Sequence, residues 1–195
     1  MASLFLASTS PRRRELLQQI GVDFESLAVE VDETHFQGET PADYVRRLAL
    51  LKARSGLEAL SAVTDAVVLG GDTTVVCEGQ VFGKPVDRAD ALRMLGMLSG
   101  KTHQVYSAVS LVSRADEAVR LTVTDVTFHA LSLRQQQSYW ETGEPQGKAG
   151  AYAIQGYGAV FVERIQGSYT GVVGLPLAET AELLERFGVA FWARS

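Results

Sequence analysis

The sequence predicts a mixed α/β fold, and two observations support this prediction. Segments with the two-residue period of strands alternate with segments of helical period along the whole 195-residue chain. Residues 65–69 form an almost purely apolar run, which is typical of a strand covered on both faces. Because no low-complexity linker or repeat interrupts the alternation, we expect a single α/β or α+β domain over residues 1–195.

Helix starts in the first half are marked by a hydroxyl residue followed by proline. Ser10-Pro11 and Thr40-Pro41 have this pattern, in which the hydroxyl caps the helix and proline fits its first turn. The expected elements are a strand at 4–6, a helix ending near Ile20, a strand at 24–31, a helix ending near Gly56, and a strand at 65–69 that stops at Gly70-Gly71-Asp72.

A hairpin with its turn at Glu78-Gly79 is expected to open the second half. Its strands are expected at 75–77 and 81–85. A glycine-dense connection at 147–158 predicts close backbone approach or positive φ angles. The other expected elements are a helix at 87–98, strands at 103–112 and 119–129, a helix at 133–141, a strand at 159–165 and a helix at 177–187.

The composition excludes several classes of protein. A net charge of -5 argues against binding of long nucleic acid by a broad basic face. No stretch has the length of a membrane span and no apolar signal core follows Met1, so we expect a cytoplasmic protein without a membrane partner. Cys77, the single cysteine, is expected to be a buried reduced thiol, because one cysteine supports neither a disulfide nor a zinc framework within the chain.

The junction between the first strand and the first helix has the chemistry of an anion site. Ser8 precedes the helix start, and Arg12, Arg13 and Arg14 lie in its first turn. A helix start carries about half a positive charge and binds phosphate readily. Three arginines would oppose this charge, so at least one is expected to have an anionic partner. A solvated basic turn is the alternative.

Two acidic residues are candidates for binding a divalent cation. Asp72 is expected at the end of the most hydrophobic strand, at the sheet edge where ligands bind in such folds, although aspartates there also form turns. Glu33 ends a different expected strand. Two carboxylates at one site suit Mg²⁺ shared with phosphate, and Lys52, Lys84 and an arginine could neutralise a polyphosphate. Taken alone, each of these basic residues is more often a surface charge. The absence of G-x-x-x-x-G-K-[ST] excludes a P-loop ATPase.

The chain resembles the Maf nucleotide pyrophosphatases from end to end. The resemblance is specific because six short motifs occur in the family's order over nearly the whole length. They lie at residues 6–17 (Leu-Ala-Ser-Thr-Ser-Pro-Arg-Arg-Arg-Glu-Leu-Leu), 70–73 (Gly-Gly-Asp-Thr), 83–85 (Gly-Lys-Pro), 98–103 (Leu-Ser-Gly-Lys-Thr-His), 148–152 (Lys-Ala-Gly-Ala-Tyr) with 154–156 (Ile-Gln-Gly), and 167–169 (Gly-Ser-Tyr) with 173–176 (Val-Gly-Leu-Pro).

This resemblance implies a fold and an activity. The fold is a mixed twisted sheet flanked by helices, with two lobes around a central cleft, akin to the inosine triphosphate pyrophosphatases and commonly a homodimer. The activity is hydrolysis of a nucleoside triphosphate to the monophosphate and pyrophosphate with a divalent cation, Mg²⁺ or Mn²⁺. Such an enzyme would act in house-cleaning of modified pyrimidine nucleotides or in control of the dTTP or UTP pool.

The resemblance also assigns residues. Asp72 aligns with the carboxylate that accepts a proton from water. Chains of the dTTP/UTP type resemble this one at Arg12, Thr73 and Gln155, where the 7-methyl-GTP type has tryptophan, glutamine and glutamate. Our mechanistic hypothesis adds a metal held by Asp72 and Glu33, with phosphates bound by Ser8, Arg13, Lys52 and Lys84, whereas Arg14 is a surface charge.

Departures from the family pattern are small. Gly71 replaces a usual alanine, Gly147 a common aspartate and Gly171 a frequent asparagine. Two alternative functions stay open at this point. One is a pyrophosphatase of the 7-methyl-GTP type, and the other is a non-catalytic regulator of cell division that senses a nucleotide.

Overall fold

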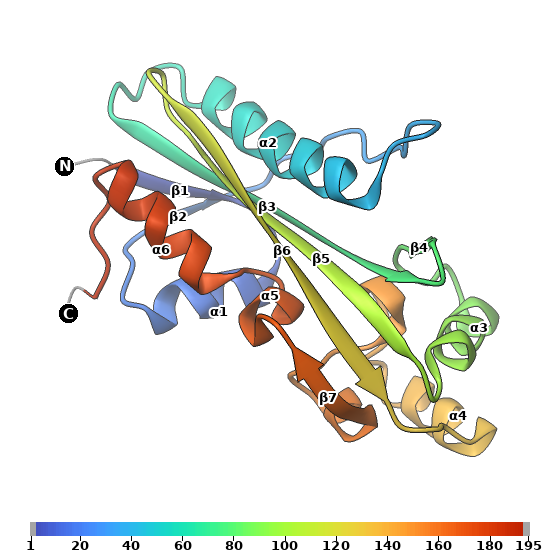
Figure 1. The fold of residues 1–195 in the computed structure, drawn as a ribbon. Helices are drawn as coiled ribbons and strands as arrows, with labels where there is room; N and C mark the ends of the chain where they lie inside the picture. Colours follow the sequence, from blue (N-terminus) through green and yellow to red (C-terminus); the bar gives the residue numbers. More distant parts are fainter. Residues whose placement is uncertain (1–2, 193–195) are drawn as a thin grey trace. The chain divides into compact units, whose positions relative to one another are not determined.

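The computed structural model describes residues 3–192 and contains a seven-stranded mixed sheet flanked by helices (Figure 1). The strand order is β2-β1-β3-β5-β6-β7, and β4 pairs with β3. The predicted α/β fold class is thereby confirmed. The elements are β1 (Ser3–Ala7), α1 (Pro11–Gln19), β2 (Glu25–Leu27), α2 (Pro41–Ala59), β3 (Ala66–Cys77), β4 (Gln80–Phe82), α3 (Arg88–Leu98), β5 (Thr102–Val112), β6 (Glu117–Phe128), α4 (Leu133–Glu141), the 3₁₀ turns η1 (Ala149–Ala151) and η2 (Tyr157–Phe161), β7 (Val162–Gln166), α5 (Tyr169–Val173) and α6 (Leu177–Arg186).

The described residues divide into two compact units. The first contains the chain up to Asp72, Ser107–Leu121 and the chain from Gly174 onward. The second contains Thr73–Tyr106 and Thr122–Val173. That the chain acts as one domain over residues 1–195 stays a prediction. Among the described residues, no helix combines the length and the apolar character needed to cross a membrane.

In the first unit, β1 pairs in parallel with both β2 and β3. Helix α2 lies on one side of these strands, and α1 and α6 lie on the other (Figure 1). The face of α2 toward the sheet has small residues, Ala49, Ala53 and Gly56, at helical spacing. A Cβ at Gly56 would lie 2.9 Å from Val68 Cγ1, so the helix packs unusually close to the strands. This close packing brings α2 side chains to the middle of β3.

Strand β3 contradicts the prediction that it stops at Gly70. It runs without a break from Ala66 to Cys77, through both glycines and Asp72. Gly70 is there for space and not for a turn, because an added Cβ would meet Ala53 N at 2.8 Å and lie even closer to the Ala49 carbonyl oxygen. The prediction that Asp72 lies at a strand end is therefore wrong. Asp72 is a buried residue inside the strand.

Three smaller expectations also need correction. The strand expected at 24–31 is only Glu25–Leu27, because β2 pairs with β1 over just three residues at the end of the sheet. The strand expected at 159–165 begins only at Val162, since a 3₁₀ turn occupies residues 157–161. Ser10 does occupy the N-cap position of α1, but its side chain makes no capping bond, and its own amide donates to Ser8 Oγ.

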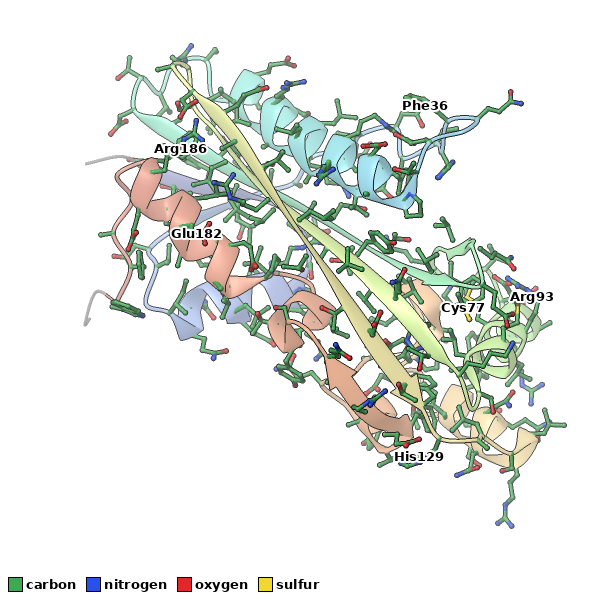
Figure 2. All side chains as sticks on the ribbon, viewed as in Figure 1. Phe36, Cys77, Arg93, His129, Glu182 and Arg186 are labelled. Carbon is green, nitrogen blue, oxygen red and sulfur yellow. The ribbon has the colours of Figure 1, made fainter. Side chains whose placement is uncertain are left out.

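The second unit confirms the predicted hairpin and the buried thiol. Val75 of β3 pairs with Phe82 of β4, and the turn residues Glu78 and Gly79 both have positive φ. Cys77 is buried, and its Sγ lies 3.8 Å from the Met97 carbonyl of α3 (Figure 2). Burial raises the pKa of the Cys77 thiol, which disfavours the reactive thiolate.

The core of the second unit holds a neutral histidine. His103 is almost fully buried, and its Nε2 lies 2.8 Å from the Tyr152 hydroxyl. The two rings also meet edge to face with Phe128. Burial lowers the pKa of His103 to about 4, so at neutral pH this residue is an uncharged part of the core.

Replacement of Gly70 by alanine tests the close packing of α2 on β3. We expect Gly70→Ala to lower the free energy of unfolding by about 2 kcal/mol or more, because the new methyl group meets backbone atoms that cannot rotate away. The matched control is Gly96→Ala in α3, where a Cβ would have its nearest neighbour, Gln136 Oε1, at 3.8 Å. That change should be neutral or stabilising by up to about 1 kcal/mol. Urea unfolding of both variants measures this, and equal midpoints would contradict the packing argument.

Candidate functional site

The Lys52 ammonium joins two carboxylates that come from different parts of the first unit. Its Nζ donates to Asp72 Oδ1 at 2.8 Å and lies 2.7 Å from Glu33 Oε1. Side-chain exposure is 13% for Lys52, 11% for Asp72 and 48% for Glu33. Lys52 therefore forms two ion pairs, a largely buried one with Asp72 and a more exposed one with Glu33. Together they join three of the residues predicted from the sequence.

The local structure explains why Lys52 reaches Asp72. Side chains alternate along a strand, so Gly70 and Asp72 point to the same face of β3. On α2, Lys52 follows Ala49 by one helical turn and lies on the same side of the helix. Ala49 and Ala53 both pack against Gly70, so Lys52, which lies between them in α2, is close enough to β3 for its side chain to reach Asp72.

Burial governs the electrostatics of this group. It raises the pKa of Asp72, and the charges of Lys52 and Arg13 only partly oppose this effect. Burial likewise lowers the pKa of Arg13, while the negative charges of Asp72 and Glu33 act in the opposite direction. The charges of Lys52 and Arg13 thus both act on the Asp72 carboxylate, and the Glu33 carboxylate acts on Arg13. That an arginine of the first helical turn has a direct anionic partner stays a prediction.

The Arg13 side chain, at the start of α1, forms hydrogen bonds to the segment after β1 and to the segment before α6. Its Nη1 donates to Ser8 Oγ at 3.2 Å, and its Nε donates to the Gly174 carbonyl at 2.8 Å. A Cβ on Gly71 would lie 3.2 Å from the same Nε, so the guanidinium packs directly over the β3 backbone. Ser8 and Arg13 therefore lie together beside the strand that contains Asp72.

The remaining predicted residues come from both units. Arg12 is half-buried in the first turn of α1, and Thr73 follows Asp72 on β3, where strand alternation points it to the opposite face. Lys84 is exposed in the loop after β4, and Gln155 is exposed in the glycine-dense connection. Their roles stay predictions. The structure joins Lys52 to Asp72 and Glu33, and it joins Ser8 to Arg13, whose charge interacts with both carboxylates.

Sequence reasoning did not find Glu144, which shapes the turn around Gln155. Its Oε1 accepts hydrogen bonds from the Tyr139 hydroxyl at 2.7 Å and the Gly158 amide at 2.9 Å, and its Oε2 accepts one from the Tyr157 amide at 2.9 Å. A Cβ at Gly156 would clash with this carboxylate. The close backbone approach predicted for the glycine-dense connection is therefore confirmed here. The glycines were the available signal, but nothing in the sequence pattern identified the partner.

The donor set of the site fits a divalent cation that shares its ligands with a substrate. Asp72 and Glu33 supply two carboxylates within reach of one point, the Lys52 Nζ. Within residues 3–192, no three His, Cys, Asp or Glu side chains form a cluster that could hold a metal by themselves. Mg²⁺ commonly binds one or two carboxylates and completes its shell with water and substrate phosphates, so two carboxylates suffice for such a site.

Comparison with known proteins identifies the family. The family described as Maf-like protein matches residues 3–187. The chain belongs to the Maf family. A Maf-family relative from Saccharophagus degradans, named dTTP/UTP pyrophosphatase, is 53% identical over 98% of this chain and 91% of its own length. One from Pseudoalteromonas atlantica with the same name is 53% identical over 96% and 98%.

Two further comparisons complete these findings for the Maf chain. A nucleoside triphosphate pyrophosphatase of Xylella fastidiosa is 52% identical over 94% of this chain and 98% of the relative. The solved structure of the Staphylococcus aureus Ham1 protein has a TM-score of 0.44 and 14% identity, and it covers 65% of this chain and 71% of that one.

Removal of Lys52 tests whether its ammonium balances a buried carboxylate. We expect Lys52→Met to lower the free energy of unfolding by about 3 kcal/mol at neutral pH, because the buried Asp72 carboxylate loses its hydrogen-bonded ammonium partner. The double variant Lys52→Met/Asp72→Asn should recover most of this loss. Arg54→Met is the control, because Arg54, which lies on the same helix as Lys52, forms an exposed pair with Glu117 of β6. Its loss should cost less than about 1 kcal/mol. Chemical denaturation of the wild type, the single variants Lys52→Met and Asp72→Asn, and the double variant measures the coupling, and strictly additive losses would argue against the pairing.

Proposed function

We propose that this chain is a nucleoside triphosphate pyrophosphatase that hydrolyses dTTP and UTP to the monophosphate and pyrophosphate. The observation that carries the proposal is the close similarity to relatives named dTTP/UTP pyrophosphatase, 53% identical over 98% of the chain in one case. Arg12, Thr73 and Gln155 agree with that substrate type. The 7-methyl-GTP type is less favoured, because it has different residues at all three positions.

Asp72 is the proposed proton acceptor for the attacking water. A buried carboxylate whose pKa is raised toward neutrality is a better base than an exposed one, and Lys52 at 2.8 Å keeps Asp72 oriented and ionised. As water attacks, its proton passes to the Asp72 carboxylate and the bond between the α- and β-phosphates breaks. Asp72 then returns the proton to solvent.

Positive charge would stabilise the phosphates during this step. In the proposal, Arg13, Lys52 and Lys84 bind the phosphate oxygens, and Ser8 donates a hydrogen bond to them. The placement of Ser8 against the Arg13 guanidinium supports a shared role for these two residues. Lys84 is exposed, and its part rests on the family resemblance alone.

Asp72 and Glu33 are the residues proposed to hold Mg²⁺ or Mn²⁺. When bound, the cation would neutralise phosphate charge and polarise the bond that breaks. Glu33 would contribute a carboxylate that is half-exposed and therefore accessible to an incoming substrate.

Base selection is assigned to Arg12, Thr73 and Gln155. The amide of Gln155 can both donate to and accept from a pyrimidine edge, whereas a glutamate only accepts and suits a cationic methylated guanine. The hydrogen bonds from the Tyr157 and Gly158 amides to Glu144 support a defined backbone for the turn that carries Gln155.

Cellular location, assembly and purpose complete the proposal. We place the enzyme in the cytoplasm as a homodimer that removes modified pyrimidine nucleotides or limits the dTTP and UTP pools. The statements on assembly and purpose rest on the family resemblance, and the cytoplasmic location is the expectation drawn from the sequence. The expectation that long nucleic acid is no partner rests on the net charge of -5.

A substrate panel tests the proposed reaction. With Mg²⁺, we expect pyrophosphate release from dTTP and UTP to exceed release from 7-methyl-GTP.

We also expect Asp72→Asn to lower kcat by about 10²-fold or more, because this variant loses the proton acceptor. Asp116→Asn removes a charge from an exposed pair with Arg186 and serves as the control, with turnover within about twofold of wild type. Nucleotide binding without pyrophosphate release would favour the sensor. A folded Asp72→Asn protein with normal turnover would remove Asp72 from the mechanism.

Gln155→Glu tests base selection. We expect kcat/KM for dTTP and UTP to fall by about tenfold or more, since the carboxylate cannot donate to the base, while the ratio of 7-methyl-GTP to dTTP activity rises. Gln146→Glu adds the same charge at an exposed position immediately before this connection and should leave the ratio unchanged. Equal losses for every nucleotide would instead assign Gln155 a general role in binding.

A further inference from the structure

Glu33 lies in a segment that has no regular structure of its own to hold it. The segment runs from the end of β2 at Leu27 to the start of α2 at Pro41, without helix or strand. Nevertheless, the Glu33 carboxylate lies 2.7 Å from Lys52 Nζ. A half-exposed side chain on such a segment keeps one position only if other contacts fix the backbone beneath it.

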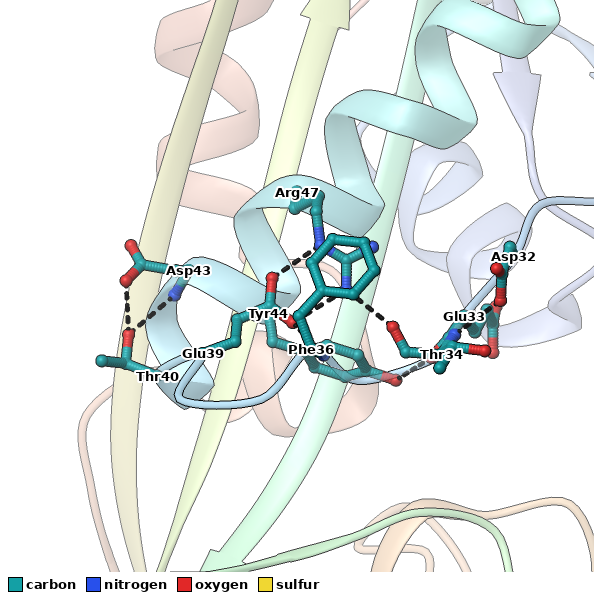
Figure 3. A network of polar contacts seen from close by, with 9 residues as sticks. All are labelled: Asp32, Glu33, Thr34, Phe36, Glu39, Thr40, Asp43, Tyr44 and Arg47. Carbon is teal, nitrogen blue, oxygen red and sulfur yellow. Dashed lines mark hydrogen bonds and ion pairs between the residues drawn. The ribbon is translucent and has the colours of Figure 1, made fainter.

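Arg47 of α2 supplies most of those contacts. Its guanidinium binds both oxygens of Glu39 in a bidentate pair, at 2.6 Å from Nε and 2.8 Å from Nη2 (Figure 3). Nη2 also donates to the Thr34 carbonyl at 3.0 Å. One planar side chain thus holds the segment at two points, and one of them is the residue that follows Glu33.

Two aromatic residues add to the contacts that hold the segment. The Arg47 guanidinium lies over the Phe36 ring, with 4.0 Å between its Cζ and the ring centroid. This cation–π contact explains why a phenylalanine is found at a position that is 54% exposed. The Tyr44 hydroxyl, one turn earlier on α2, donates to the carbonyl of Glu33 itself at 3.0 Å (Figure 3). Tyr44 and Arg47 therefore fix the backbone carbonyls of two consecutive residues, Glu33 and Thr34.

Bonds within the segment make it stiff. The Thr34 amide donates to Asp32 Oδ1 at 2.9 Å, and the Phe36 amide donates to Glu39 Oε2 at 3.2 Å. The Arg47 hydrogen bonds hold the pKa of Glu39 at about 2, so the bidentate pair stays ionised at any pH suited to an assay.

We propose that Arg47 is a positioning residue that, together with Tyr44, fixes the Glu33 carboxylate at Lys52 and Asp72. The inference rests on the proposed function through the role given there to Glu33. Arg47 acts through the backbone of residues 33 and 34 and has no part in the chemistry. Lysine cannot replace it, because an ammonium group lacks the planar fork that meets Glu39 and Thr34 together.

A double-mutant cycle between Arg47 and Glu33 tests this role. We expect Arg47→Met to lower kcat/KM for dTTP by about tenfold or more, as losses of supporting residues commonly do, and Arg47→Lys to recover only part of it. In a Glu33→Gln background, Arg47→Met should have less than about a twofold further effect, because the residue it positions has already been disabled. The control is Arg46→Met. Arg46 is the residue before Arg47, carries the same charge and makes an exposed contact with Asp43. This variant should leave kcat/KM unchanged.

Amide hydrogen exchange supplies a readout that does not depend on activity. Arg47→Met should speed exchange in residues 32–39 without changing β1 or the unfolding midpoint of the whole protein, and Arg46→Met should not. A smaller increase, confined to the same segment, is expected for Tyr44→Phe.

Each failure has its own signature. Equal losses from Arg47→Met in both backgrounds, unchanged activity in the Glu33→Gln protein, or unchanged exchange in residues 32–39 would overturn the positioning role. Wild-type protein that releases no pyrophosphate from any nucleotide would instead reject the proposed function, and the exchange measurement would still decide whether Arg47 holds the Glu33 segment.

Discussion

The ammonium of Lys52 between Asp72 and Glu33 is the interaction on which the candidate site depends. A buried carboxylate inside a strand is costly, and a cation that reaches it must come from an element packed very close to that strand. Gly70 permits this approach, because helix α2 occupies the space that any larger residue would fill. The pairing of Lys52 with Asp72 thus depends on the close packing of the α2 backbone against Gly70.

Rigid and irregular elements contribute differently to this group. Asp72 and Lys52 are fixed by a central strand and a long helix, so their pairing follows from the fold. Glu33 comes from a segment without helix or strand, and its position depends on side chains of the same helix, Tyr44 and Arg47. Helix α2 therefore provides one charged member of the site and holds the segment that provides another.

The distribution of candidate residues follows the division into units. Strand β3 passes from the first unit to the second between Asp72 and Thr73. The residues assigned to chemistry at Asp72, Lys52 and Glu33 belong to the first unit. Of the residues assigned to base selection, Thr73 and Gln155 belong to the second, where Glu144 organises the backbone around Gln155. Chemistry and base selection are thus largely assigned to different parts of the chain.

By itself, the sequence determined the alternation of strands and helices, the hairpin at Glu78-Gly79, the family and the candidate residues, because these depend on local periodicity and ordered motifs. Only the tertiary structure decided that β3 continues through Gly70 to bury Asp72, since a glycine that makes room for a helix has the same sequence signal as one that makes a turn. It also revealed Arg47 and Glu144. Each binds backbone groups as well as side chains, and because any residue type carries a backbone amide and carbonyl, no sequence pattern specifies those contacts.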